Sequence, residues 1–90
     1  MHKVLLVDDQ KLIRDGIKSL LGLSGKVAVV AECADGSTVV DACRQHQPDV
    51  ILLDLSMPLM NGVQTLAALQ QAAIAIPVLI LTTFDEHELV

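Results

Sequence analysis

The sequence has almost no aromatic residues, and this limits how its core can be built. Phe84 is the single aromatic side chain among 90 residues. Hydrophobic residues still make up 52% of the chain, so leucine, valine, isoleucine and alanine must fill the core. These residues are typical of parallel strands that helices cover on both faces. A chain of this length suits one domain with a small core.

The chain also lacks a basic cluster. Its six lysines and arginines are scattered, and eleven acidic residues give a net charge of −5. Direct nucleic-acid binding by these residues is therefore not expected, because such binding relies on the neutralisation of phosphates. The acidic residues favour instead a divalent cation or a partner with a basic face.

Long hydrophobic runs and cysteine motifs are missing as well. The longest apolar stretch, residues 72–84, is interrupted by Pro77 and is too short to cross a bilayer. No signal peptide opens the sequence, and we expect a cytoplasmic protein without membrane contact. Cys33 and Cys43 lack the spacing of a zinc site. A disulfide between them is one alternative. Two small buried hydrophobic residues are the simpler interpretation.

Strand and helix patterns alternate along the chain. Short apolar runs predict four strands, at 3–7, 27–33, 50–53 and 78–81. Apolar residues at helical spacing predict helices over 11–21, 38–46 and 63–73, and a fourth helix is expected from residue 85. Thr38 and Asp41 have the spacing of a cap for the second helix. The alternation predicts an α/β fold, a doubly wound parallel sheet with helices on both faces.

Acidic residues follow two of the predicted strands. Asp8 and Asp9 come directly after the first strand, and Asp54 follows the third. The carboxyl ends of parallel strands meet at one edge of a sheet, so we expect the three carboxylates to lie together. Their mutual repulsion calls for a cation such as Mg²⁺, which prefers oxygen ligands. One carboxylate could then attack phosphorus as a nucleophile, and the Thr82 hydroxyl after the fourth strand could donate to a phosphoryl oxygen.

Each of these residues also has a plain structural explanation. An aspartate after a strand often caps a helix or forms a turn, and a threonine at a strand end is often only a good strand former. The combination of three acids and a hydroxyl at the ends of parallel strands favours a phosphoryl site over these separate explanations.

Three segments carry a resemblance to a known family. They are residues 4–9 (VLLVDD), residues 54–58 (DLSMP) with Asn61-Gly62, and residues 79–83 (LILTT). With these segments the chain resembles the receiver domain of bacterial two-component response regulators. Residues 10–16 (QKLIRDG) and 81–85 (LTTFD) further resemble receivers of the LuxR-type transcription regulators.

The resemblance implies a flavodoxin-like sheet with strand order 2-1-3-4 and a phosphorylation-controlled switch. Asp54 would accept a phosphoryl group from a sensor histidine kinase. Mg²⁺ would bind Asp8, Asp9, Asp54 and the backbone carbonyl of Ser56, and Thr82 would be the switch hydroxyl. Such a protein is no enzyme beyond slow self-dephosphorylation, and it would reach DNA only through a C-terminal effector domain.

The family also has a fifth strand that ends in a lysine, and a fifth helix, which this sequence does not contain. We therefore expect residues 1–90 to form a receiver domain that is incomplete at its C-terminus. The strand at 78–81 would then be an exposed edge with Leu79 and Leu81 uncovered. Such an edge favours pairing with a second copy, which would give a homodimer.

Three other functions compete with the signalling switch. A hydrolase of the haloacid-dehalogenase type needs a second aspartate where Ser56 stands. A flavodoxin-like nucleotide or flavin module needs a phosphate-binding loop where Asp8, Asp9 and Gln10 stand. An interaction module that works without phosphorylation stays open as the alternative.

Overall fold

The computed structural model describes residues 2–54 and 62–81, which form four strands and three α-helices. The strands are β1 (His2–Val7), β2 (Val27–Cys33), β3 (Val50–Asp54) and β4 (Val78–Leu81). The helices are α1 (Lys11–Gly22), α2 (Val39–His46) and α3 (Gly62–Gln71), with a short 3-10 turn, η1 (Gly36–Thr38), before α2. All seven of these predicted strands and helices are confirmed, with bounds that differ by up to two residues. The helix predicted from residue 85 lies outside the described residues.

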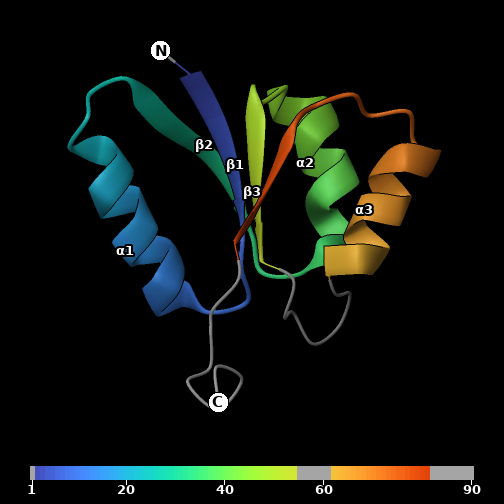
Figure 1. Cartoon of the computed structure of the whole chain (residues 1–90), viewed down its shortest axis with the longest axis horizontal. Helices are drawn as coiled ribbons and strands as arrows, with labels where there is room; N and C mark the ends of the chain where they lie inside the picture. The colour runs from blue at the N-terminus through green and yellow to red at the C-terminus, as the bar shows by residue number, and fades with distance from the viewer. Residues whose placement is uncertain (1, 55–61, 82–90) are drawn as a thin grey trace, which may run out of the picture.

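The four strands form one parallel sheet in the order β2-β1-β3-β4. Helix α1 covers one face of the sheet, and α2 and α3 cover the other (Figure 1). Parallel neighbours need a crossover between them, and a helix supplies each one here. The strand order and the doubly wound arrangement confirm the predicted fold.

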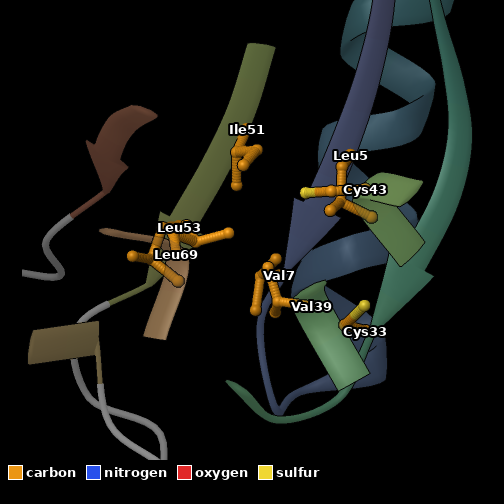
Figure 2. Close-up of a cluster of buried hydrophobic side chains, with 8 residues drawn as sticks. All are labelled: Leu5, Val7, Cys33, Val39, Cys43, Ile51, Leu53 and Leu69. Carbon is orange, nitrogen blue, oxygen red and sulfur yellow. The ribbon is translucent and has the colours of Figure 1, made fainter. Parts of the chain in front are cut away.

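The main core lies between the sheet and the pair α2 and α3. It consists of eight buried side chains drawn in Figure 2: Leu5, Val7, Cys33, Val39, Cys43, Ile51, Leu53 and Leu69. Both cysteines in this cluster are free thiols, as the simpler interpretation of the sequence predicted. A smaller cluster on the opposite face consists of Val4, Leu6 and Leu52, against which Ile17 and Leu21 of α1 pack.

The central strands are apolar without alternation because they are covered on both sides. Successive residues of β1 point to opposite faces, so Leu5 and Val7 enter the main core while Val4 and Leu6 face α1. Ile51, Leu52 and Leu53 of β3 divide in the same way. This burial explains the uninterrupted apolar runs that mark both strands in the sequence.

Strand β2 changes face halfway along its length. Its register against β1 shifts between Val4 and Leu5, where Val4 pairs with Val29 but Leu5 pairs with Ala31. Val27 and Val29 therefore pack on the α1 side, whereas Ala31 and Cys33 pack in the main core. One extra residue in a strand reverses which face the following residues occupy. Glu32 is turned toward α1 as a result.

The start of the second helix differs from the prediction. The Thr38 side chain makes no capping hydrogen bond at the start of α2. Asp35 instead accepts a hydrogen bond from the Ser37 amide at 2.7 Å and caps the short turn η1 that precedes α2. An aspartate at the end of a strand is free to cap the next turn, whereas Thr38 already lies within helical backbone.

Strand β4 forms one edge of the sheet, and it is the least covered of the four. Leu79 is 57% exposed and Ile80 43% exposed. The predicted exposure of Leu79 is confirmed, while the side chain of Leu81 lies outside the description. Pairing of this edge with a second copy stays a prediction. Among the helices in the described ranges, none is both long and apolar enough to cross a membrane.

Candidate metal centre

Strand register brings the predicted aspartates together. Val7 of β1 pairs with Leu53 of β3, and Asp8 and Asp54 are the next residues on the two neighbouring strands. One carboxylate oxygen each from Asp8, Asp9 and Asp54 lies within 4.8 Å of the others. The sequence therefore located this cluster correctly from two strand ends alone.

Two of the three carboxylates are withdrawn from water. Asp8 is 4% exposed and Asp54 is 7% exposed, while Asp9 is more accessible. Burial raises the pKa of Asp8, and the nearby charges of Asp54 and Asp9 raise this pKa further. The Gln10 amide donates to Asp8 Oδ1 at 2.9 Å, which opposes the rise in pKa by favouring the ionised form.

The donor set suits a hard divalent cation. Octahedral ligands about 2.1 Å from Mg²⁺ lie roughly 3 to 4 Å from one another. Carboxylate oxygens already within 4.8 Å need only a small adjustment to reach such positions. Burial is the main cause of the raised pKa of Asp8, and a cation here would offset the further rise caused by the charges of Asp54 and Asp9. The three aspartates could therefore hold a metal ion.

The turn that carries Asp8 and Asp9 is held by hydrogen bonds on several sides. The Asp8 amide donates to the Cys33 carbonyl of β2 at 3.0 Å. The Asp8 carbonyl accepts from Arg14 Nη1 of α1 at 2.5 Å. Asp8 is thus tied to a neighbouring strand, to its own turn and to the following helix, which limits how far its carboxylate can move.

Arg14 was not singled out from the sequence, and the structure places it beside the acidic cluster. Its Nε donates to Glu32 Oε1 at 3.1 Å, while its Nη1 reaches the Asp8 carbonyl. One sequence signal could have found it, since Arg14 lies within the first turn of the helix that follows the two aspartates. Its partner Glu32 could not be foreseen, because the contact depends on the shifted register of β2.

Two of the predicted site residues, Ser56 and Thr82, lie outside the described residues. Leu81, the residue before Thr82, pairs with Asp54 in the sheet. The roles predicted for Ser56 and Thr82 therefore stay predictions.

Comparison with known proteins identifies the family. The model of the response regulator receiver domain matches residues 4–90. The chain therefore belongs to the response regulator receiver domains. It is 42% identical over 83 residues to the nitrate/nitrite response regulator protein NarP of Escherichia coli K12. This alignment covers 92% of this chain and 39% of NarP. It is 40% identical over 88 residues to the probable transcriptional regulatory protein NarL of Mycobacterium tuberculosis H37Rv, over 98% of this chain and 41% of that protein.

Solved structures agree with this assignment. A two-component response regulator of the LuxR family from Aurantimonas sp. SI85-9A1 matches with a TM-score of 0.86 at 30% identity, over 94% of this chain and 61% of that chain. The signal receiver domain of the putative response regulator NarL from Mycobacterium tuberculosis matches with a TM-score of 0.83 at 39% identity, over 99% of this chain and 72% of that chain. The predicted resemblance to LuxR-type receivers is confirmed. The chain spans about two fifths of the length of the curated relatives it matches.

Proposed function

We propose that this chain is a phosphorylation-controlled signalling switch. Asp54 accepts a phosphoryl group from a sensor histidine kinase in a Mg²⁺-dependent reaction, and the phosphorylated form controls a DNA-binding output domain. The observation that carries this proposal is the burial of Asp54 at the end of β3, with its carboxylate within 4.8 Å of Asp8 and Asp9. Membership of the receiver family and the similarity to NarP and NarL support it.

The chain's own residues divide the work of phosphoryl transfer. An Asp54 carboxylate oxygen forms a bond to phosphorus while the bond between phosphorus and the kinase histidine nitrogen breaks, and that nitrogen then takes up a proton. Asp8, Asp9, Asp54 and the Ser56 carbonyl would hold the metal. Bound Mg²⁺ supplies stabilisation for the charge on the phosphoryl oxygens.

The remaining roles follow from the family. Thr82 donates its hydroxyl to the phosphoryl group and so couples phosphorylation to a change in conformation. The chain works in the cytoplasm as a signalling protein, with no catalytic activity beyond slow loss of its own phosphoryl group. Its contact with DNA runs through a separate output domain, in keeping with its net charge of −5.

Labelling with acetyl phosphate tests the proposed function. With radiolabelled acetyl phosphate and Mg²⁺, the protein is expected to take up label that alkaline hydroxylamine removes, since an acyl phosphate forms. Asp54→Asn is expected to abolish the label. Asp41→Asn is a matched control, because Asp41 is an exposed aspartate in α2, outside the acidic cluster, and should leave labelling intact. Labelling that persists in Asp54→Asn, or that does not need Mg²⁺, would contradict the proposal.

The exposed edge of the sheet supports a second candidate function, an interaction module that works without phosphorylation. Leu79 and Ile80 are 57% and 43% exposed on edge strand β4, and such an edge can pair with a strand of a second copy. Size-exclusion chromatography with light scattering is expected to show dimers that dissociate in Leu79→Lys. A monomer that melts cooperatively at all concentrations would rule this candidate out.

A further inference from the structure

Arg14 joins three parts of the molecule at the acidic cluster. It belongs to the first half of α1, donates through Nε to Glu32 of β2 at 3.1 Å, and donates through Nη1 to the carbonyl of Asp8 at 2.5 Å. Its side chain is only 14% exposed. A guanidinium group can make both contacts at once because its donors are held in a rigid planar fork.

The contact with the Asp8 carbonyl controls more than Asp8. That carbonyl belongs to the planar peptide unit that links Asp8 to Asp9, so fixing its oxygen fixes the amide and Cα of Asp9 as well. Asp8 is also held by its own amide, which donates to the Cys33 carbonyl at 3.0 Å. Rotation of this peptide would move the carboxylates of Asp8 and Asp9 relative to Asp54.

Glu32 gives the guanidinium a fixed anchor. Lys18 Nζ lies 2.9 Å from Glu32 Oε2, and Arg14 Nε lies 3.1 Å from the other oxygen. Hydrogen bonds from Lys18 and then Arg14 lower the pKa of Glu32, so this carboxylate stays ionised near neutral pH. Lys18 therefore shares Glu32 with Arg14, but the structure gives it no contact with Asp8.

We propose that Arg14 is a positioning residue for the metal centre, which it serves by holding the peptide between Asp8 and Asp9 so that both carboxylates face Asp54. The inference rests on the proposed function, because it takes Mg²⁺ to be the ion that binds there. The proposed site then includes, besides the three aspartates, Arg14 on α1 and its ion-pair partner Glu32 on β2. Partners of this kind, one step removed from a metal, typically change metal affinity by about 10- to 100-fold.

The sign of the effect separates positioning from simple charge. Arg14 is a cation close to the binding place of another cation, so its removal by itself should tighten Mg²⁺ binding. Loss of positioning should weaken it. A weaker affinity after removal of Arg14 therefore cannot come from the change in charge.

Mg²⁺ affinity of the full chain, measured by isothermal titration calorimetry, tests the inference. Arg14→Met keeps the apolar stem and removes every donor, and it is expected to raise the Kd for Mg²⁺ about tenfold. Lys18→Met is the matched control, since it removes a cation from the same glutamate without touching Asp8. Its Kd is expected to stay within about twofold of the wild type or to fall.

Each outcome bears on the proposal. A Kd in Arg14→Met that is unchanged or lower, or an equal rise in Lys18→Met, would overturn it. If circular dichroism shows that Arg14→Met is not folded at the assay temperature, Arg14→Lys is measured instead. A single ammonium group cannot replace the guanidinium fork at both the Asp8 carbonyl and Glu32. A wild-type Kd in Arg14→Lys would then overturn the proposal. Failure of the wild type itself to bind Mg²⁺ would count against the proposed function instead.

Discussion

The two faces of the sheet differ in how strongly apolar contacts hold them to their helices. On the side of α2 and α3, eight buried side chains form one continuous apolar cluster. On the side of α1, the buried apolar cluster among the described residues 2–54 and 62–81 is limited to Val4, Leu6 and Leu52, and α1 itself has no buried residue. Ion pairs from Arg14 and Lys18 to Glu32 supplement the apolar contacts there. One side of the sheet is thus held by a large apolar cluster, whereas the α1 side combines a smaller apolar cluster with ion pairs and reaches the acidic cluster.

The difference between the two faces bears on the function of the acidic cluster. Buried apolar contacts set the stability of a fold, whereas a few hydrogen bonds near a site set its geometry. The acidic turn after β1 belongs to both faces, because Asp8 extends the buried strand and its carbonyl contacts Arg14 of α1. We therefore expect a change at the site to affect α1 more than α2.

Removal of one buried helix side chain should show the largest contrast between the faces. Leu69 of α3 is 4% exposed within the apolar cluster, and Leu69→Ala is expected to lower the free energy of unfolding by about 3 kcal/mol. Leu21 of α1 is only half-buried, so Leu21→Ala should lower it by about 1 kcal/mol. Urea denaturation measures both values. Equal losses would show that the faces do not differ.

Metal binding should stabilise the α1 side of the sheet more than the side of α2 and α3. At a Mg²⁺ concentration ten times its Kd, the free energy of unfolding is expected to rise by about 1.4 kcal/mol, and Asp9→Asn should abolish the gain. Amide hydrogen exchange is expected to slow more in α1 than in α2, because Arg14 connects α1 to the acidic turn. A uniform slowing over both helices would argue against this connection.

Salt should affect the two faces unequally. Glu32→Gln removes the shared partner of Arg14 and Lys18, and the expected loss in free energy of unfolding is below about 1 kcal/mol at low ionic strength. The loss should nearly vanish in about 1 M NaCl because these charges are partly exposed and screened. The cost of Leu69→Ala should persist in the same buffer. Thermal melting at two salt concentrations measures both.

The smallest change is expected at Asp8, where the sign is informative. Burial and then the charges of Asp54 and Asp9 raise the pKa of Asp8 above its ordinary value of 3.8. When folding raises the pKa of an acid, the protein loses stability as the pH rises from the ordinary pKa through the raised pKa. Asp8→Asn should therefore stabilise the metal-free protein at pH 7 and give no gain below about pH 3.8.

With Mg²⁺ added, the wild type should become more stable than Asp8→Asn, because the substitution removes a metal ligand. Urea denaturation with chelator and with Mg²⁺, at both pH values, provides the comparison. A destabilised Asp8→Asn protein at pH 7 without metal would mean that the hydrogen bond from Gln10 outweighs burial and the repulsion together.

Much of the site could be predicted because it depends on short segments. The runs Val4–Val7 and 50–53 could be recognised as buried parallel strands, and the aspartates after them then had to share an edge. The sequence predicts a cap by Thr38, and Thr38 does stand at the start of α2, but the capping hydrogen bond is made one turn earlier, by Asp35 at the 3-10 turn, which the sequence does not reveal. Short turns depend on backbone angles that many sequences can adopt.

The sequence by itself determined the order of strands and helices, the apolar runs of β1 and β3, and the three acids at their ends. Each of these depends on residues that are neighbours along the chain. The tertiary structure alone decided that Glu32 faces α1, because a one-residue shift in the register of β2 reverses the faces of all later residues. Arg14 and Glu32, 18 positions apart, meet only through that shift, and through them the acidic turn gains its support from α1.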